Sequence, residues 1–366
     1  MAKHSATFAA AGCMLILILD TKTALAGAQE GLSICFSTVI PTLFPFSVLA
    51  TYLCSHLSGS ISILRSLGRL CRMPTGTEGI LLLSFLGGYP IGIQCVCEAY
   101  QSGALQKSDA QRMMGFCSNA GIAFIFGMSG RLFPSPWYSV WLLIICVSSA
   151  VITGMLLPGT KTMHYKPIRS NTLSFQKCIE SSIRSMARIC AWIILFRIIL
   201  YFSTRWFLFC FSKELQSIYM GVLELTGGIL SLQGFSPGVL FMLASAYLSF
   251  GGLCVLMQSS SIATSAGLQI KAYFPGKILQ CSLSLLLSYL IQGILFKDCI
   301  TFHISWVCIL SGIAIFLCIL LQKIKLDVEI SPEVLYNTER NGGNGDAFSK
   351  KDSETVPILH TMRPAG

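Results

Sequence analysis

Long uncharged apolar runs separated by short polar gaps make up most of this chain. Each run is long enough for an α-helix to cross a hydrocarbon core of ~30 Å, which takes about 20 residues. The strict alternation of apolar and polar residues that marks a membrane β-strand is absent. The pattern therefore predicts an all-α, polytopic integral membrane protein. The runs cover residues 33–64, 79–97, 113–130, 132–160, 225–270, 278–296 and 299–322.

The overall composition favours the same solvent. The chain has 366 residues, of which 53% are hydrophobic and only 11% are charged. Soluble domains carry about 25% charged residues, and a soluble chain this apolar would expose patches that aggregate. We therefore expect the lipid bilayer to be the main partner of the chain and its location to be a cell membrane.

The net charge of +10 is explained by topology. Basic residues gather in the polar gap at residues 161–188, which contains Lys161, Lys166, Arg169, Lys177, Arg184 and Arg188. Loops rich in Lys and Arg stay in the cytoplasm under the positive-inside rule, so this gap predicts a cytoplasmic linker. After Gln322 the composition turns polar and predicts a disordered tail, also cytoplasmic, over residues 323–366. No folded basic face is evident, which excludes nucleic acid as a partner.

The 16 cysteines are expected to pack rather than to bind metal. Most of them lie in apolar runs, where Cys behaves as a small hydrophobic residue. Cys95 and Cys97 form a C-x-C pair, but no matching pair or histidine cluster accompanies it. We expect no metal and no other cofactor.

The N-terminus resembles a signal peptide in part. Lys3 precedes an apolar stretch at residues 6–19, and Ala24-Leu25-Ala26 is similar to a cleavage site. Charged residues between the stretch and that site favour an uncleaved first membrane helix over residues 1–23.

Several apolar runs contain residues that interrupt helices. Pro41 and Pro45 fall in the first run, and a Gly-Gly-Tyr-Pro sequence containing Gly87, Gly88 and Pro90 lies within the second. Residues 118–121 open the third run, and Gly251 and Gly252 interrupt a later one. In lipid, backbone groups freed from helical bonding must be buried in protein or line a wet cavity. Close helix packing explains a single glycine equally well, but explains clusters of such residues less well.

The glycine interruptions recur at one spacing of 164 residues. That offset places residues 85–88 over 249–252, Gln94 over Gln258, Gly103 over Gly267, and Lys107 over Lys271. Paired broken segments in two halves of a chain indicate a transporter whose binding site lies near the membrane midplane. We therefore expect the two breaks to meet there, with Gln94 and Gln258 facing one shared cavity.

Two ionisable residues lie within apolar surroundings. Glu224 has no basic neighbour within a helical turn or two, and a charged carboxylate at that depth is costly. It is expected either to be protonated or to face a polar cavity, and the alternative is a position at the membrane interface. Arg197 either pairs with Glu224, meets an anionic substrate, or extends its side chain toward the cytoplasmic interface.

Four polar side chains beside the interruptions are candidate ligand contacts. Gln94, Gln258, Ser118 and Asn119 can donate and accept hydrogen bonds to a planar solute with ring nitrogens or carboxylates. Hydrogen bonding between helices is the alternative role. No nucleophile–base pair and no motif for hydrolysis or phosphoryl transfer is present, so we do not expect an enzyme.

At these segments the chain resembles the sporulation integral membrane protein family (YlbJ-type), whose members carry two nucleoside-recognition "Gate" domains. The matching stretches are VIPTLFPF at residues 39–46, GGYPIG at 87–92, FCSNAGIAFIFG at 116–127 and SFGGLCVLMQ at 249–258. The resemblance implies two Gate-like repeats, at residues 24–160 and 189–322, on either side of the basic linker. Gln94 stands where many members carry Lys, and Ile122 where many carry Pro, which leaves the substrate at the first broken helix open.

The resemblance also implies a function. It points to a secondary-type transporter of a small polar or anionic solute, of which dipicolinate is the suggested example, acting in sporulation at the outer forespore membrane. A coupling proton or sodium ion and an oligomer are compatible with this interpretation. Two alternatives stay open: a nucleoside transporter, and a structural or assembly protein of sporulation that transports nothing.

Overall fold

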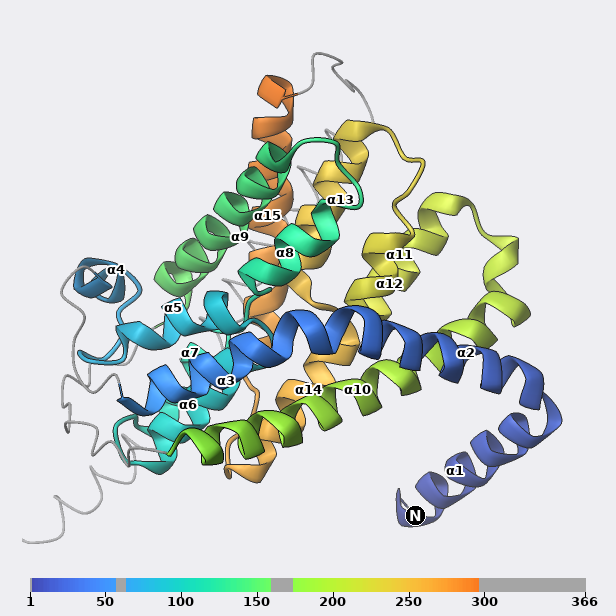
Figure 1. Ribbon diagram of the computed structural model, residues 1–366, viewed down its shortest axis with the longest axis horizontal. Coiled ribbons are helices and arrows are strands. Elements are labelled where there is room, and N and C mark those ends of the chain that lie inside the picture. Colours follow the sequence, from blue (N-terminus) through green and yellow to red (C-terminus); the bar gives the residue numbers. More distant parts are fainter. Residues whose placement is uncertain (1, 57–63, 159–173, 296–366) are drawn as a thin grey trace, which may run out of the picture. The chain divides into compact units, whose positions relative to one another are not determined.

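The computed structural model describes residues 2–56, 64–158 and 174–295, and over these ranges it contains helices and no β-strand (Figure 1). The predicted all-α class is confirmed. Helices long and apolar enough to cross a membrane are found at Thr21–Leu53, Pro136–Leu156, Phe175–Trp206, Pro237–Ser265 and Tyr273–Gly293. These five segments fit a multi-pass membrane protein. The last predicted run at residues 299–322, the tail, and the linker up to residue 173 lie outside the described residues.

The N-terminal segment forms two helices that change direction at Asp20. Helix α1 (Ala2–Leu19) ends there, and the Asp20 carboxylate accepts a hydrogen bond from the Thr23 N–H at the start of α2 (Thr21–Ile34). The apolar part of α1 at Ala10–Leu19 is shorter than a full membrane span. Its side chains remain uncovered within the described chain, since Phe8 is 77% exposed.

The prolines of the first run do not break it. A π-helical turn, η1 (Cys35–Val39), continues α2 into α3 (Ile40–His56), which contains Pro45. The expected interruption at Pro41 and Pro45 was therefore wrong: the wider π turn precedes the first proline and the chain stays helical from Thr21 to Leu53.

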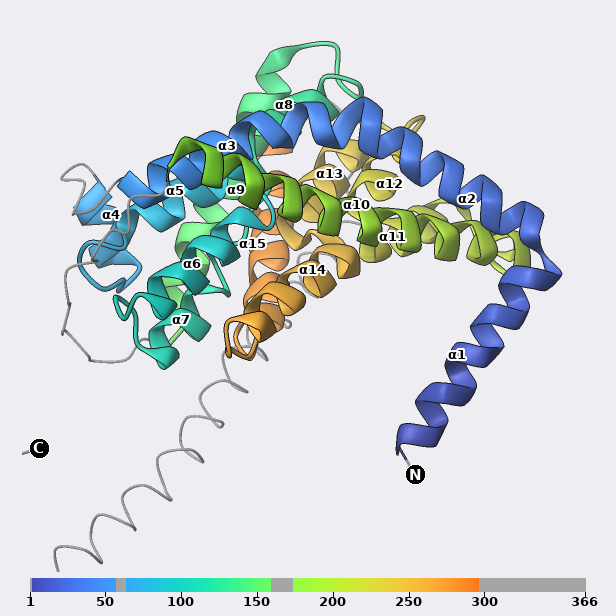
Figure 2. The same ribbon diagram turned by 60° about the horizontal axis from the view of Figure 1, so that its bottom comes forward.

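Helix α2 packs along α10 (Phe175–Trp206), as both ribbon views show (Figure 2). The contact is close because Gly27 and Gly31 lie one turn apart on the same face of α2. A Cβ atom on Gly27 would lie 2.8 Å from the Ile198 Cα, and one on Gly31 would lie 2.9 Å from the Ile194 Cα. Small residues at this spacing let membrane helices approach closely.

The rest of the first half consists of short helices followed by one long one. They are α4 (Arg65–Leu70), α5 (Glu78–Gly87), α6 (Ile91–Gln101), α7 (Lys107–Met113), α8 (Ile122–Ser129) and α9 (Pro136–Leu156). The predicted interruptions are confirmed, since α5 ends at Gly87 and α6 begins at Ile91, and residues 114–121 separate α7 from α8.

The second half of the described chain begins after α10. It contains η3 (Leu208–Cys210), α11 (Lys213–Leu223), α12 (Leu225–Leu230), α13 (Pro237–Phe250), α14 (Gly252–Ser265) and α15 (Tyr273–Leu295). Gly251, with a φ of +83°, separates α13 from α14 as predicted. Helix α13 packs against both α15 and α9 (Figure 1).

The 164-residue correspondence is visible around the glycine breaks only. Helix α6 ends at Gln101 and α14 ends 164 residues later at Ser265. Gly103 and Gly267 follow these ends with φ values of +76° and +75°. Further along, the correspondence is lost, because α15 is continuous where the first half is interrupted at residues 114–121. Two complete Gate-like repeats stay a prediction.

Candidate functional site

The interrupted segments of both halves meet one another. A Cβ atom on Gly88 would lie 2.8 Å from the Gly121 N, and one on Gly252 would lie 3.2 Å from the Leu223 carbonyl oxygen. The Tyr89 hydroxyl joins these two pairs, because it donates to the backbone carbonyls of Leu248 at 3.1 Å and Ser249 at 3.2 Å. The predicted meeting of the two glycine breaks is therefore confirmed.

A small cavity, here called the inner cavity, lies where the breaks meet. Its volume is about 50 Å³, enough for a few water molecules. The first half contributes Tyr89 and Gly121 to its wall, and the second half contributes Glu224, Thr226 and Gln258. Most of the remaining wall is apolar, so the few polar groups determine what the cavity can bind.

Glu224 occupies the junction of two short helices and is only 2% exposed. Its backbone is extended between α11 and α12, so its side chain can cap α12. The two carboxylate oxygens accept hydrogen bonds of 2.7 Å each from the N–H groups of Thr226 and Gly227. Glu224 is therefore buried and lines a cavity, as one of the two expectations held, and the helix end that it caps is buried with it.

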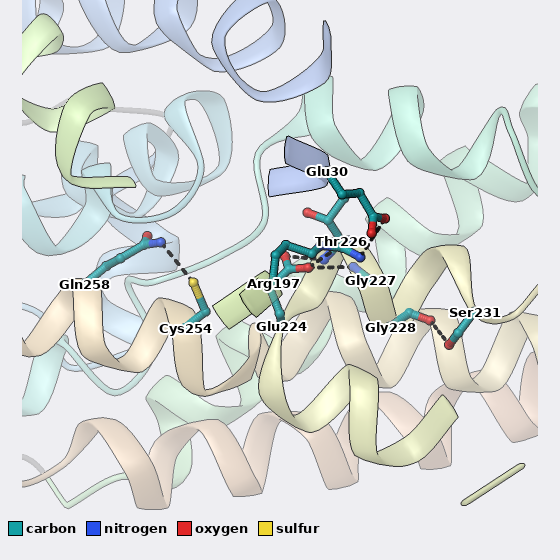
Figure 3. Close-up of polar contacts among 9 residues, drawn as sticks. All are labelled: Glu30, Arg197, Glu224, Thr226, Gly227, Gly228, Ser231, Cys254 and Gln258. Carbon is teal, nitrogen blue, oxygen red and sulfur yellow. Dashed lines mark hydrogen bonds and ion pairs between the residues drawn. The ribbon is translucent and has the colours of Figure 1, made fainter. Parts of the chain in front are cut away.

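The Glu224 carboxylate has a cationic partner on another helix. Arg197 of α10 places Nη2 3.1 Å from Glu224 Oε2 and Nη1 3.2 Å from Glu30 Oε1 of α2 (Figure 3). Of the three expected roles for Arg197, the structure shows pairing with Glu224. The group of three side chains carries one net negative charge when all are ionised, and its Glu30 end is the more exposed one.

The Arg197 guanidinium keeps hydrogen-bonding capacity. It is 7% exposed, yet its Nε and Nη2 atoms have no hydrogen-bond acceptor in suitable geometry within the described chain. An unsatisfied buried donor is costly. A bound water or solute oxygen would satisfy these donors.

The two glutamines do not share a cavity. Gln258 lines the inner cavity, where its Nε2 approaches Cys254 Sγ at 3.4 Å (Figure 3). Gln94 lines a second cavity of about 170 Å³, here called the outer cavity. The prediction of one shared cavity was wrong: Gln94 lies in the first turn of α6 and Gln258 in the second turn of α14, and the two side chains line different cavities although the two helices are in contact.

The outer cavity is mainly polar and is formed by α6, α10 and α14. Gln94 donates to Glu98 at 3.1 Å and to Ser181 at 3.2 Å, and it accepts from Ser185 at 3.3 Å. Burial raises the pKa of Glu98, and the hydrogen bond from Gln94 opposes that rise. The exposed side chains of Arg184 and Arg188 complete the wall.

Ser118 and Asn119 lie next to the breaks but line neither cavity. The Asn119 amide donates to Ser84 Oγ and to the Phe116 carbonyl, both at 2.9 Å, and accepts from Gln280 at 2.9 Å. The Ser118 hydroxyl lies 3.4 Å from the Tyr273 hydroxyl. These contacts are the hydrogen bonds between segments that the alternative interpretation expected.

Sequence reasoning missed Lys277 and Glu30. Lys277 was placed at the edge of an apolar run, but α15 begins at Tyr273 and brings the lysine inside the protein with no exposed surface. The sequence Pro275-Gly276 before it marks a helix start, which could have indicated that the lysine belongs to the helix. Glu30 lies among polar residues just before the first apolar run, so it was not recognised as an ionisable residue in apolar surroundings.

The described residues contain no group of three or more His, Cys, Asp or Glu side chains that could hold a metal ion. In comparisons with known proteins, no family model, curated protein or solved structure matches the chain.

Proposed function

We propose that this chain is a secondary-type membrane transporter for a small polar or anionic solute. The observation that carries the proposal is the inner cavity, whose wall is built by backbone interruptions from both halves of the chain. Interrupted helices are tolerated at membrane depth where they are buried or line a cavity, and transporters bind solutes at such points. A protein that only scaffolds others has no use for them.

The outer cavity supports an anionic solute. The Arg184 and Arg188 guanidinium groups suit carboxylates, because each can donate two parallel hydrogen bonds to one carboxylate. Gln94 beside them can donate to a ring nitrogen by exchanging its hydrogen bond to Glu98 or Ser181. An aromatic dicarboxylate such as dipicolinate has both features, in agreement with the sporulation family that the sequence resembles. On that proposal the protein acts in the outer forespore membrane.

The polar groups of the inner cavity favour a nucleoside as the second candidate. The cavity holds only a few water molecules in this structure, so a nucleoside would require a more open conformation. The cavity wall is largely apolar, and its polar groups include the Glu224 carboxylate and the Gln258 amide. A carboxylate and an amide can recognise the donor and acceptor groups of a base or a ribose, whereas the negative charge of Glu224 disfavours an anion there.

Uptake into proteoliposomes made with the purified protein tests the proposal. We expect dipicolinate uptake above that of protein-free liposomes, and a large loss in Arg184→Gln and Arg188→Gln. Lys177→Gln is the matched control, because Lys177 lies on the same helix and lines neither cavity. Uptake of nucleosides but not of dipicolinate would favour the second candidate.

Substitutions in the inner cavity separate transport from scaffolding. Glu224→Gln should leave membrane insertion intact and abolish uptake or its pH dependence. Gln258→Leu should reduce uptake as well. A purely structural protein would take up no solute, either as the wild type or as a variant. Its folding and assembly would tolerate both substitutions, and Gln94→Leu as well. That result would leave the assembly role as the remaining function.

A further inference from the structure

The side chain of Lys277 ends in a cage of oxygen atoms. Its Nζ atom lies 3.1 Å from the Tyr89 hydroxyl, 3.0 Å from the Ser249 carbonyl and 2.7 Å from Gln280 Oε1, and it also contacts the Ser118 carbonyl. The side chain is 0% exposed. The cage is thus formed by three separate segments together with the helix that carries the lysine.

Within the described residues, no carboxylate pairs with this lysine. None of the ion pairs among the described residues involves Lys277, whereas the buried Arg197 has two carboxylates. An ammonium without a counter-ion is costly to bury. The dipoles of the surrounding oxygens must therefore supply the compensation.

The helix interruptions make these oxygens available. Ser118 belongs to the non-helical segment 114–121, so its carbonyl is not used in a helix. Ser249 is the penultimate residue of α13. The last four carbonyls of a helix lack an intrahelical partner and carry the negative end of the helix dipole.

We propose that this cage is a monovalent-cation site and that Lys277 fills it with a tethered ammonium in place of a free ion. An ammonium has three N–H donors, and here it faces four oxygens, as in a coordination shell. Carbonyl oxygens freed by unwound helices bind Na⁺ in transporters, and carbonyl cages bind K⁺ in channels. The lysine holds the same place permanently, so folding around the breaks needs no added ion.

The proposal predicts that shortening the side chain opens the site to free cations. Purified Lys277→Ala protein in detergent should unfold at a lower temperature than wild type in choline chloride. Replacing choline by Na⁺, K⁺ or methylammonium at constant ionic strength should raise its midpoint saturably, by about 5 °C at saturation. The wild-type midpoint should not respond to the same exchange. This test needs no transport assay, so its outcome is independent of the proposed function.

Lys277→Met is the matched variant, because methionine fills the volume without a charge. It should be destabilised and should show no response to the cations. Two results would overturn the proposal: a Lys277→Ala midpoint that is equal in all four salts, or a Lys277→Met protein as stable as wild type. Failure of Lys277→Ala to fold in any of the salts would contradict it too, since a free cation would then not replace the ammonium. Gln280→Ala keeps the lysine but removes one oxygen of the cage, so it should fold with a lowered midpoint.

Discussion

The Arg197 guanidinium lies 3.1 Å from the Glu224 carboxylate, and both side chains are buried. Removing the arginine would leave that carboxylate without its cationic partner. We expect Arg197→Leu to lower the free energy of unfolding by about 3–5 kcal/mol, as for other broken buried pairs. Arg205→Leu is the control, because Arg205 pairs with Asp20 but is 61% exposed, and its loss should cost about 0–1 kcal/mol. Thermal unfolding of the detergent-purified variants measures both, and equal losses would contradict the buried pair.

The Tyr89 hydroxyl joins the two glycine breaks, so its removal should loosen them. Tyr89→Phe keeps the ring but deletes the hydrogen bonds to the Leu248 and Ser249 carbonyls. We expect a loss of about 1–3 kcal/mol in unfolding free energy, since the Leu248 carbonyl loses this donor and the buried Lys277 Nζ loses one of its acceptors. Tyr100→Phe should change stability little, because no hydrogen bond of the Tyr100 hydroxyl is found within the described ranges. An equally large loss of unfolding free energy in Tyr100→Phe would mean that the effect comes from general packing and not from these hydrogen bonds.

Two glycines with the same backbone conformation separate strain from close approach. Gly88 and Gly103 have φ values of +77° and +76°, but a Cβ atom on Gly88 would meet Gly121, whereas one on Gly103 would meet open space. Gly103→Ala should cost about 1 kcal/mol from the backbone conformation alone. Gly88→Ala should cost several times as much, or prevent folding, as read from the yield of monodisperse protein. Similar yields for the two variants would argue against the tight contact.

Glu98 gives a pH dependence that can be measured. It lies on α6, outside the five candidate spans, and burial raises its pKa above the ordinary value of 4.5. The folded protein thus holds this proton more tightly than the unfolded chain, so the stability it contributes is lost as the pH rises above 4.5. Glu98→Gln should therefore be more stable than wild type at pH 7, by a margin that shrinks toward pH 4.5. Glu180→Gln, at an exposed position of α10, should show no such trend in pH-dependent unfolding.

The basic linker and the C-terminal tail are expected to face the same side of the membrane, the cytoplasm. Single cysteines at Arg169 and after Gln322, on a cysteine-depleted background, should react with an impermeant maleimide from that side only. Labelling of the two positions from opposite sides would exclude this topology.

The sequence predicted the breaks better than it predicted their partners. Gly87-Gly88 and Gly251-Gly252 were visible because glycine pairs inside apolar runs are local signals. The pairing of Arg197 with Glu224 was one of several open alternatives, since it depends on how α10 packs against α11 and α12. Gln94 and Gln258 line different cavities because of the way their helices pack in the folded chain, which no local pattern encodes. Pro41 and Pro45 predicted a helix interruption that does not occur, because the chain accommodates them after a π-helical turn at Cys35–Val39.

Helix α10 relates the two cavities to the thickness of a membrane. At about 1.5 Å per residue its 32 residues extend over roughly 48 Å, well beyond a hydrocarbon core of ~30 Å. Arg188, Arg197 and Arg205 are spaced along its axis by about 13 Å and about 12 Å. The outer two are thus about 26 Å apart, less than the thickness of the hydrocarbon core. Arg188 lines the outer cavity and the next residue, Ile189, lines the inner cavity, so one helix separates a polar chamber from an apolar one within a single turn.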